Sequence, residues 1–333
     1  MTLEVLGWTP ERAAEFGERC PGLSPARVTS EHRGTWRVHT GSEELVVRLP
    51  GRGWRGERIE RPAVGDWVGV RRGKKLIEAL LSRRSVFLRK AAGVSEHEQV
   101  VAANVDAVFV MMGLDDDFNV RRLERYLAAT WASGAQPVVV LNKTDLCEVV
   151  ASRVAETRVV AVGCPVVAIS AREPEALDVI APHAHGTICL VGSSGVGKST
   201  LTNLMLGDEV QEVKEVRERD NKGRHTTTRR ELFVMPGGAL LIDTPGMREL
   251  SLWRAGAGVD HAFADVIAHA DCKFRDCEHR ETESGCGVWA AVEAGEVSVQ
   301  RARSYRKLRD ELDEQAKRRE VAERKAGRGR KRR

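Results

Sequence analysis

The chain has 333 residues, of which 42% are hydrophobic and 30% charged, a composition typical of a soluble globular protein with two or three domains. Its 53 lysines and arginines exceed its 48 acidic residues, so the formal net charge is +5 and the chain is only mildly basic. No apolar run approaches the roughly 20 residues that cross a bilayer, and the amino terminus lacks a secretory signal, so we expect a cytoplasmic protein without a membrane partner.

Short β-like runs occupy the first part of the chain, after a partly helical lead-in that ends near residue 26. They lie between glycine, proline and charged turns, at residues 28–29, 35–38, 45–49 and 66–70. Several short strands of this kind predict a small barrel, with an OB-fold and an SH3-like barrel as alternatives. A barrel can bind nucleic acid through aromatic and basic side chains. The candidates are Trp36, Arg52, Trp54 and Arg55, and ordinary barrel packing is the alternative for the two tryptophans.

Apolar strands then alternate with helical stretches, which is typical of a parallel α/β sheet. The predicted strands are residues 105–112, 137–141, 165–169, 187–191 and 239–242, and a helix is predicted at 120–133. Polar motifs follow several of these strands directly. Open α/β sheets bind ligands at the carboxyl ends of their strands, so this order predicts a binding site there.

The last part of the chain is polar and helical. It contains a Cys/His cluster and a charged helix from about residue 299 to 325, and its final Gly, Arg and Lys residues predict disorder. The positive charge at this end suits nucleic-acid phosphates. We therefore predict three domains: residues 1–93 as lead-in and barrel, 94–250 as the α/β domain, and 251–333 as a helical domain with a basic tail.

A glycine-rich loop after the strand at 187–191 has the spacing of a phosphate-binding loop. Its glycines allow the backbone to wrap around phosphate oxygens, Lys198 reaches the β- and γ-phosphates, and Ser199 ligates magnesium. We expect nucleotide contacts from the whole loop, which consists of Gly192, Ser193, Ser194, Gly195, Val196, Gly197, Lys198, Ser199 and Thr200.

A tetrapeptide after the strand at 137–141 selects the base. Its residues are Asn142, Lys143, Thr144 and Asp145. The Asp145 carboxylate accepts from the N1–H and exocyclic amine of guanine, a pattern that adenine lacks, while Asn142 contacts the base edge and the Lys143 stem covers its face. Ser170 and Ala171, after the next strand, are the expected supporting loop. The predicted nucleotide is therefore GTP.

Two further segments predict the switches that respond to the γ-phosphate. Asp243 ends a strand and is expected near magnesium, and the amide of Gly246 senses the γ-phosphate. The next residue is Met247, which cannot orient water, so slow intrinsic turnover is expected. Within residues 223–228, Thr227 is the candidate that completes the magnesium shell and His225 the candidate that positions water. A surface role without chemistry is the alternative for His225.

Three of the seven cysteines cluster beside a histidine near the carboxyl end. Three thiolates and one imidazole form the closed ligand set of a structural zinc ion. The predicted ligands are Cys272, Cys277, His279 and Cys286. His261 and His269 are alternative ligands that fit less well, because they lie on the far side of Cys272.

The guanine-reading tetrapeptide precedes the phosphate loop, the reverse of the order in an ordinary GTPase. With this order, the switch segments and the Cys/His cluster, the chain resembles the RsgA (YjeQ) family of circularly permuted bacterial GTPases. The resemblance implies an OB-fold, a P-loop GTPase domain and a zinc domain. It implies binding to the small (30S) ribosomal subunit and its 16S rRNA late in maturation, with GTP hydrolysis to GDP and phosphate stimulated by the subunit and followed by release. It places the catalytic histidine at His225.

One departure lies in the zinc segment, where six residues, 280–285, separate the histidine from the last cysteine and the family commonly has five. We expect a monomer with one structural Zn²⁺, and Mg²⁺ bound with GTP. Two alternatives remain: a permuted GTPase that serves the large subunit, and an RNA-binding module with a non-hydrolytic GTP site. Met247 makes the non-hydrolytic module conceivable, whereas the intact Lys198, Ser199 and Asp243 argue against it.

Overall fold

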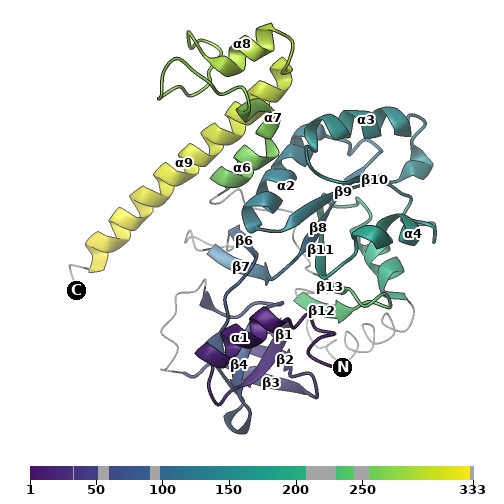
Figure 1. The fold of residues 1–333 in the computed structure, drawn as a ribbon, viewed down its shortest axis with the longest axis vertical. Coiled ribbons are helices and arrows are strands. Elements are labelled where there is room, and N and C mark those ends of the chain that lie inside the picture. Colours follow the sequence, from purple (N-terminus) through teal and green to yellow (C-terminus); the bar gives the residue numbers. More distant parts are fainter. Residues whose placement is uncertain (33, 52–59, 91–97, 208–229, 244–254, 331–333) are drawn as a thin grey trace.

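The computed structural model describes residues 1–32, 34–51, 60–90, 98–207, 230–243 and 255–330. Three parts follow one another along the chain: a barrel, an α/β sheet with helices, and a helical part that carries the carboxyl end (Figure 1). Within the described residues, no helix is both long enough and apolar enough to span a membrane.

A closed barrel forms the first part. The lead-in contains helix α1 (Pro10–Arg19), and the strands are β1 (Ser24–His32), β2 (Thr35–His39), β3 (Glu44–Arg48), β4 (Trp67–Arg71) and β5 (Leu76–Leu80). Their order is β1-β2-β3-β5-β4, and β4 pairs again with β1, which closes the ring. Only the β3–β5 contact is parallel. The predicted small OB-type barrel is therefore confirmed, and it has five strands, of which β5 was not among the runs predicted from the sequence.

The barrel interior is apolar and includes a tryptophan that we had considered for the surface. Trp36 is only 2% exposed, and its indole Nε1 donates to the Pro62 carbonyl at 2.8 Å. It packs among Val38, Val68 and Ile77. The suggestion that Trp36 contacts nucleic acid was therefore wrong, and the alternative of ordinary barrel packing is confirmed for it, because alternation along β2 points the side chain into the core. Arg52, Trp54 and Arg55 lie outside the described residues.

A β-hairpin connects the barrel to the α/β sheet. Strands β6 (Val86–Lys90) and β7 (Glu98–Ala103) pair antiparallel with each other. The predicted boundary at residue 93 falls between them, within the segment 91–97 that is not described.

Six strands form the α/β sheet, in the order β10-β9-β8-β11-β13-β12. They are β8 (Ala107–Gly113), β9 (Gln136–Asn142), β10 (Val166–Ala168), β11 (Thr187–Gly192), β12 (Arg230–Val234) and β13 (Leu240–Asp243). All but β12 are parallel to their neighbours. Strands β8 and β11 are buried along their whole length, as expected for a sheet covered on both faces.

Alternate side chains of β8 enter two separate cores. Val108, Val110 and Met112 pack with helix α2 (Val120–Ser133), whose predicted bounds are confirmed. Phe109 and Met111 pack instead with helix α4 (Ala176–Ile180) and with the helix of residues 198–207. Helix α3 (Val150–Val160) lies above β9 and β10 in the view of Figure 1, and its apolar side chains join the same core as those of α2. The phosphate-loop helix and α2 thus cover opposite faces of the sheet.

The barrel and the α/β sheet share one continuous strand arrangement. Barrel strand β1 pairs antiparallel with β12, with Ser30 opposite Glu231 and Glu31 opposite Arg230. A buried guanidinium adds a second connection, because Arg27 Nη2 donates to Thr187 Oγ1 of β11 at 2.8 Å. Burial lowers the pKa of Arg27 to about 10, so it remains charged at neutral pH. The barrel is therefore hydrogen-bonded to the strand that leads into the phosphate loop.

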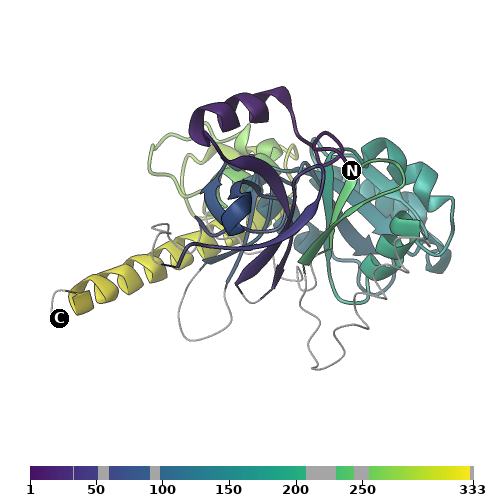
Figure 2. The same ribbon diagram turned by 90° about the horizontal axis from the view of Figure 1, so that it is seen from below.

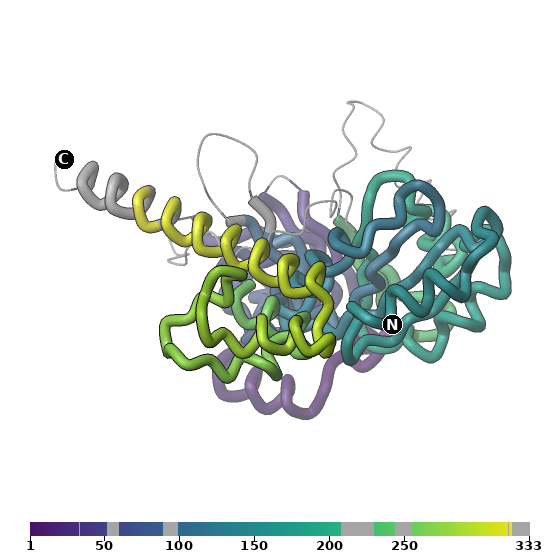
Figure 3. The backbone as a smooth tube through the Cα atoms, turned by 90° about the horizontal axis from the view of Figure 1, so that it is seen from above, coloured from purple at the N-terminus to yellow at the C-terminus, as the bar shows by residue number. Residues whose placement is uncertain are grey.

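The helical part packs on the face of the sheet covered by α2. It contains α6 (Gly256–Ala262), α7 (Ala264–Ile267), α8 (Gly287–Glu293) and α9 (Val299–Arg330). Helix α6 contacts α2 so closely that a methyl group at Gly258 would lie 2.2 Å from the Ala128 carbonyl oxygen. Figures 2 and 3 show α9 leaving the body of the molecule toward the carboxyl end.

Helix α9 also corrects the prediction of a disordered tail. The helix continues to Arg330, past the expected end near residue 325, and only 331–333 lie outside the described residues. The reason is that Arg, Lys, Glu and Ala have high helix propensity, which here outweighs the cost of about 1 kcal/mol for each glycine, Gly327 and Gly329.

Candidate functional site

The predicted nucleotide motifs converge at one edge of the sheet. Strand β8 lies between β9 and β11, and pairing sets Gly113 opposite Asn142 and Met111 opposite Gly192. Because all three strands run in the same direction, the tetrapeptide at 142–145 and the phosphate loop emerge side by side. Asp243, at the end of β13, follows directly on the other side of β11.

The phosphate loop folds tightly before the helix of residues 198–207. At Gly197, φ is +101°, and a methyl group there would lie 2.2 Å from Asn142 Nδ2. Lys198 Nζ donates to the carbonyls of Gly192 at 2.8 Å and Ser193 at 2.5 Å. The helix begins at Lys198, so its amino end and the loop amides supply the positive potential that phosphates need.

Asn142 joins three segments that are far apart in the sequence. Its amide Nδ2 donates to the Val196 carbonyl at 2.8 Å, and its Oδ1 accepts from the Ala171 amide at 2.8 Å. The side chain is 3% exposed. One residue of the tetrapeptide therefore holds the phosphate loop and the loop after β10 together, and contact of Asn142 with the base edge stays a prediction.

The rest of the tetrapeptide lies around this junction. Lys143 has a φ of +69°, and its Nζ binds Asp115 Oδ2 at 2.6 Å, a contact that lowers the pKa of Asp115. Thr144 and Asp145 lie in a short turn of 3₁₀ helix, Thr144–Leu146, and Asp145 Oδ2 is 3.7 Å from Arg172 Nη1.

The loop after β10 contributes a buried hydroxyl. Ser170 is 4% exposed, and its Oγ has no hydrogen-bond partner among the described residues. Ser194, Ser199 and Thr200 are exposed on the loop and the first turn of its helix.

Two aspartates lie at this edge of the sheet that the sequence analysis did not predict as site residues. Asp115 binds Lys143 as described, and Asp117 accepts a hydrogen bond from Ser193 Oγ. Arg122 Nη2 in turn lies 2.7 Å from Asp117 Oδ1. Their position was the signal that could have revealed them, because residues 114–119 follow β8, the buried strand between the two strands that carry the motifs.

Several predicted site residues lie outside the described part of the chain. They are His225 and Thr227 of the first switch and Gly246 with Met247 of the second. Their roles stay predictions.

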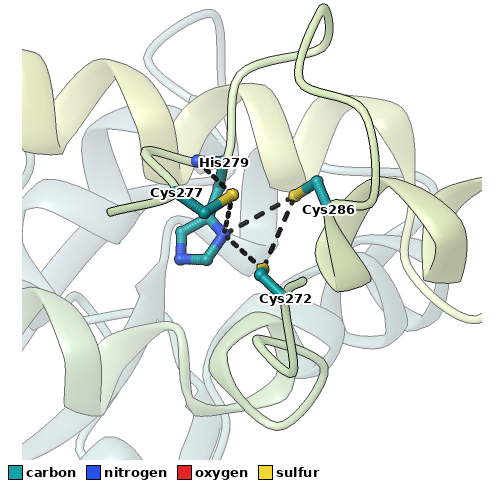
Figure 4. A group of neighbouring side chains, drawn as sticks. All are labelled: Cys272, Cys277, His279 and Cys286. Atoms are coloured by element: carbon teal, nitrogen blue, oxygen red, sulfur yellow. Dashed lines mark hydrogen bonds between the residues drawn. The ribbon is translucent and has the colours of Figure 1, made fainter. Parts of the chain in front are cut away.

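The four predicted metal ligands come together beside α8 and α9 (Figure 4). The ligand atoms of Cys272, Cys277, His279 and Cys286 all lie within 4.8 Å of one another. His279 Nδ1 is 3.4, 3.6 and 3.6 Å from the three sulfurs, and the Cys272 and Cys286 sulfurs are 4.0 Å apart. A tetrahedral zinc site with ordinary bond lengths has edges of about 3.6 Å for S···N and about 3.8 Å for S···S. The donor set therefore fits a tetrahedral metal ion.

Backbone and neighbouring groups hold these ligands. The Gly287 amide points at Cys272 Sγ at 3.3 Å, and a methyl group at Gly287 would collide with the His269 carbonyl oxygen at 2.4 Å. Trp289 Nε1 donates to the His279 carbonyl at 2.9 Å. Burial lowers the pKa of His279, which favours the neutral imidazole that binds metals.

The longer segment before Cys286 is accommodated by a turn around one glutamate. The Glu283 carboxylate accepts from the Glu278 amide at 3.2 Å and from the Arg280 amide at 3.1 Å. Burial and this carboxylate raise the pKa of the Cys277 thiol to about 12. The extra residue thus leaves the four-ligand cluster intact.

The two alternative histidines are engaged elsewhere. His261 stacks on Trp131 with ring centroids 3.9 Å apart, and His269 Nδ1 lies 3.4 Å from Glu296. Neither belongs to the cluster.

Comparison with known proteins gives a consistent answer over most of the chain. A sequence model described as RsgA GTPase matches residues 80–253. The chain is 44% identical to the small ribosomal subunit biogenesis GTPase RsgA of Opitutus terrae, over 93% of this chain and 90% of the relative. It is 45% identical to the protein of that name in Xanthomonas axonopodis pv. citri, over 93% of this chain and 88% of the relative.

Solved structures agree in fold. The crystal structure of YjeQ from Thermotoga maritima matches with a TM-score of 0.64 and 27% identity, covering 87% of this chain and 98% of that one. YloQ, described as a circularly permuted GTPase, matches with a TM-score of 0.61 at 24% identity, covering 89% and 97%. The predicted permutation is thereby confirmed at the level of fold.

Proposed function

This chain belongs to the RsgA GTPase family, and from that premise we propose that it hydrolyses GTP to GDP and phosphate during late maturation of the small ribosomal subunit. The observation that carries the nucleotide site is the Asn142 side chain, bonded to both the phosphate loop and the loop after β10. The partner is supported by the names of the relatives, which are small-subunit biogenesis GTPases.

Guanine recognition is assigned to the loops that Asn142 holds together. Asp145 accepts from the two donors on the Watson–Crick edge of guanine, and the Lys143 stem covers one face of the base while its ammonium stays near Asp115. Asn142 has one amide hydrogen beyond its bond to Val196, which suits the base edge. Thr144 shapes the turn, and the loop of Ser170 and Ala171 closes the pocket.

Phosphate binding is assigned to the loop of residues 192–200. Lys198 has three N–H donors and two carbonyl partners here, so its ammonium can also bind phosphate oxygens, which carry full charge and bind an ammonium more strongly. The residues that would hold magnesium are Ser199, Asp243 and Thr227, and Mg²⁺ would neutralise charge on the β- and γ-phosphates. Hydroxyl and carboxylate oxygens are the donors that this ion prefers.

Hydrolysis is assigned to a switch histidine that acts after the subunit has fixed it. His225 orients the attacking water, and Gly246 senses the γ-phosphate. Because Met247 cannot bind water, the chain alone turns over slowly and binding to the subunit raises the rate. Loss of the γ-phosphate is then followed by release.

The outer parts of the chain are assigned to binding the ribosomal subunit and its 16S rRNA. We take the domains as residues 1–93, 94–250 and 251–333, with the chain working as a cytoplasmic monomer. The barrel and the basic end of α9 provide RNA contacts, and the cysteine cluster holds one structural Zn²⁺, supported by the tetrahedral spacing of its donors.

The deciding experiment is GTP turnover measured with and without purified small ribosomal subunits, and with large subunits for comparison. We expect small subunits, but not large subunits, to stimulate GTP turnover strongly. No stimulation by small subunits would refute the proposed role. His225→Ala should keep GTP binding and lose the stimulation. His185→Ala, which removes an exposed histidine after α4, is the matched control and should behave as wild type. A fully stimulated His225→Ala enzyme would remove His225 from the mechanism.

A further inference from the structure

The loop between β8 and α2, residues 114–119, contacts both nucleotide-binding motifs. Its Asp115 carboxylate binds Lys143 of the guanine-reading tetrapeptide at 2.6 Å. Two residues later, the Asp117 carboxylate accepts a hydrogen bond from Ser193 Oγ of the phosphate loop. The loop therefore holds both motifs from one place in the fold.

Asp117 is itself held firmly. Arg122, in the first turn of α2, places Nη2 2.7 Å from Asp117 Oδ1 and also donates to the Asp117 carbonyl. The Asp117 amide donates to Asp115 Oδ1 at 3.2 Å, and the Arg122 amide donates to the helix cap Asn119 at 3.0 Å. An anion beside a phosphate site is ordinarily unfavourable. Here the Arg122 guanidinium offsets that charge, so the carboxylate can act as a hydrogen-bond acceptor.

The phosphate loop needs such an anchor. Glycines at 192, 195 and 197 leave its path weakly determined by the backbone alone. Lys198 holds the Ser193 carbonyl at 2.5 Å, but the same ammonium also has to bind phosphate. The side-chain bond to Asp117 does not depend on Lys198.

We propose that Asp117 is a positioning residue for the nucleotide phosphates: by holding Ser193, it fixes the path of the phosphate loop. The proposal rests on the proposed GTP site. It extends that site to an acidic loop outside the nucleotide motifs, and it connects the phosphate loop to α2, on which the zinc-binding part packs.

Binding of fluorescent mant-GDP and mant-GTP to the full-length protein tests the proposal. Asp117→Ala and Ser193→Ala should each weaken binding about three- to tenfold, as expected for one partly exposed hydrogen bond to a charged group. The double variant should be no weaker than either single variant, because both remove the same bond. Asp117→Asn keeps an acceptor oxygen and should bind within about twofold of wild type.

Asp116→Ala is the matched control, since Asp116 is an exposed neighbour of equal charge in the same loop. It should bind as wild type. Guanosine, which has no phosphate, should compete equally well with mant-GDP for wild type and for Ser193→Ala, whereas a general loss of structure would weaken guanosine too.

Three results would overturn the proposal: unchanged binding by Ser193→Ala, additive losses in the double variant, or equal losses for guanosine and GDP. Should Asp117→Ala fail to fold, Ser193→Ala still decides, because it removes one hydroxyl. If wild type itself binds no guanine nucleotide, the proposed function fails first, so the two failures are distinguishable.

Discussion

Arg301 of α9 should be the residue on which attachment of the helical part to the GTPase fold depends most. Its side chain is 4% exposed and reaches Glu124 of α2 at 2.8 Å, Asp265 at 2.8 Å and the Ala262 carbonyl at 2.6 Å. Its guanidinium also lies over the Phe263 ring, 4.0 Å from the centroid. Replacement by methionine, Arg301→Met, keeps the apolar stem and removes all of these contacts.

The loss of stability comes from the buried carboxylate that Arg301→Met leaves without a cation. Glu124 is also 4% exposed, so Arg301→Met leaves a carboxylate buried without its cation. Breaking a buried pair from one side typically costs about 3–5 kcal/mol. Asp265 is 32% exposed and can regain water, so we add nothing for it. The predicted loss in the free energy of unfolding is about 4 kcal/mol.

Urea denaturation gives the measurement, with the midpoint lowered at an unchanged m-value. The matched control is Arg303→Met, on the same helix, where the cation is 58% exposed and pairs with an equally exposed Glu281. That change should cost under about 0.5 kcal/mol. The combination Glu124→Leu with Arg301→Met should cost less than Arg301→Met alone, because no charge is then stranded. A loss below about 1 kcal/mol for Arg301→Met would refute the reasoning.

Three further outcomes are expected. Trp36→Ala should lower the free energy of unfolding by about 3–5 kcal/mol in urea titrations, since it empties the barrel core; a loss under about 1 kcal/mol would contradict that placement. Removal of metal by a strong chelator should raise hydrogen exchange across residues 264–293 and leave exchange in the barrel strands unchanged; metal loss without that change would argue against a structural ion. The hydrogen bond from Lys143 lowers the pKa of Asp115 in the folded state, so its contribution is complete above about pH 4 and is lost as pH falls through the folded pKa. Asp115→Asn should therefore flatten the acid side of the stability curve, measured as urea midpoints between about pH 2 and 7, and an unchanged acid slope would count against the pair.

Motifs with strict spacing could be predicted from the sequence. The phosphate loop, the tetrapeptide at 142–145 and the cysteine cluster each carry a fixed residue pattern, and the strands before them were visible as apolar runs. The bounds of α2 were also predictable, because Asn119 caps it and Gly134 ends it in a left-handed conformation.

Contacts between distant segments could not be predicted in this way. The hydrogen bond of Ser193 to Asp117 joins positions 76 residues apart, and the bond of Arg27 to Thr187 joins positions 160 apart. No local pattern marks either partner, because each residue type is common on surfaces. The placement of Trp36 could not be predicted either, because an aromatic residue in a short strand suits a barrel core and a binding face equally.

Helix α9 projects from the body of the molecule (Figure 1). Leu312 is the last side chain on it that is described as buried, and the helix continues to Arg330. At 1.5 Å per residue, the helix extends about 27 Å past Leu312. A tilt of α9 by about 5° where it meets α2 would move the carboxyl end of the helix by more than 2 Å. A small rotation beside the sheet therefore becomes a larger displacement at the far end of α9.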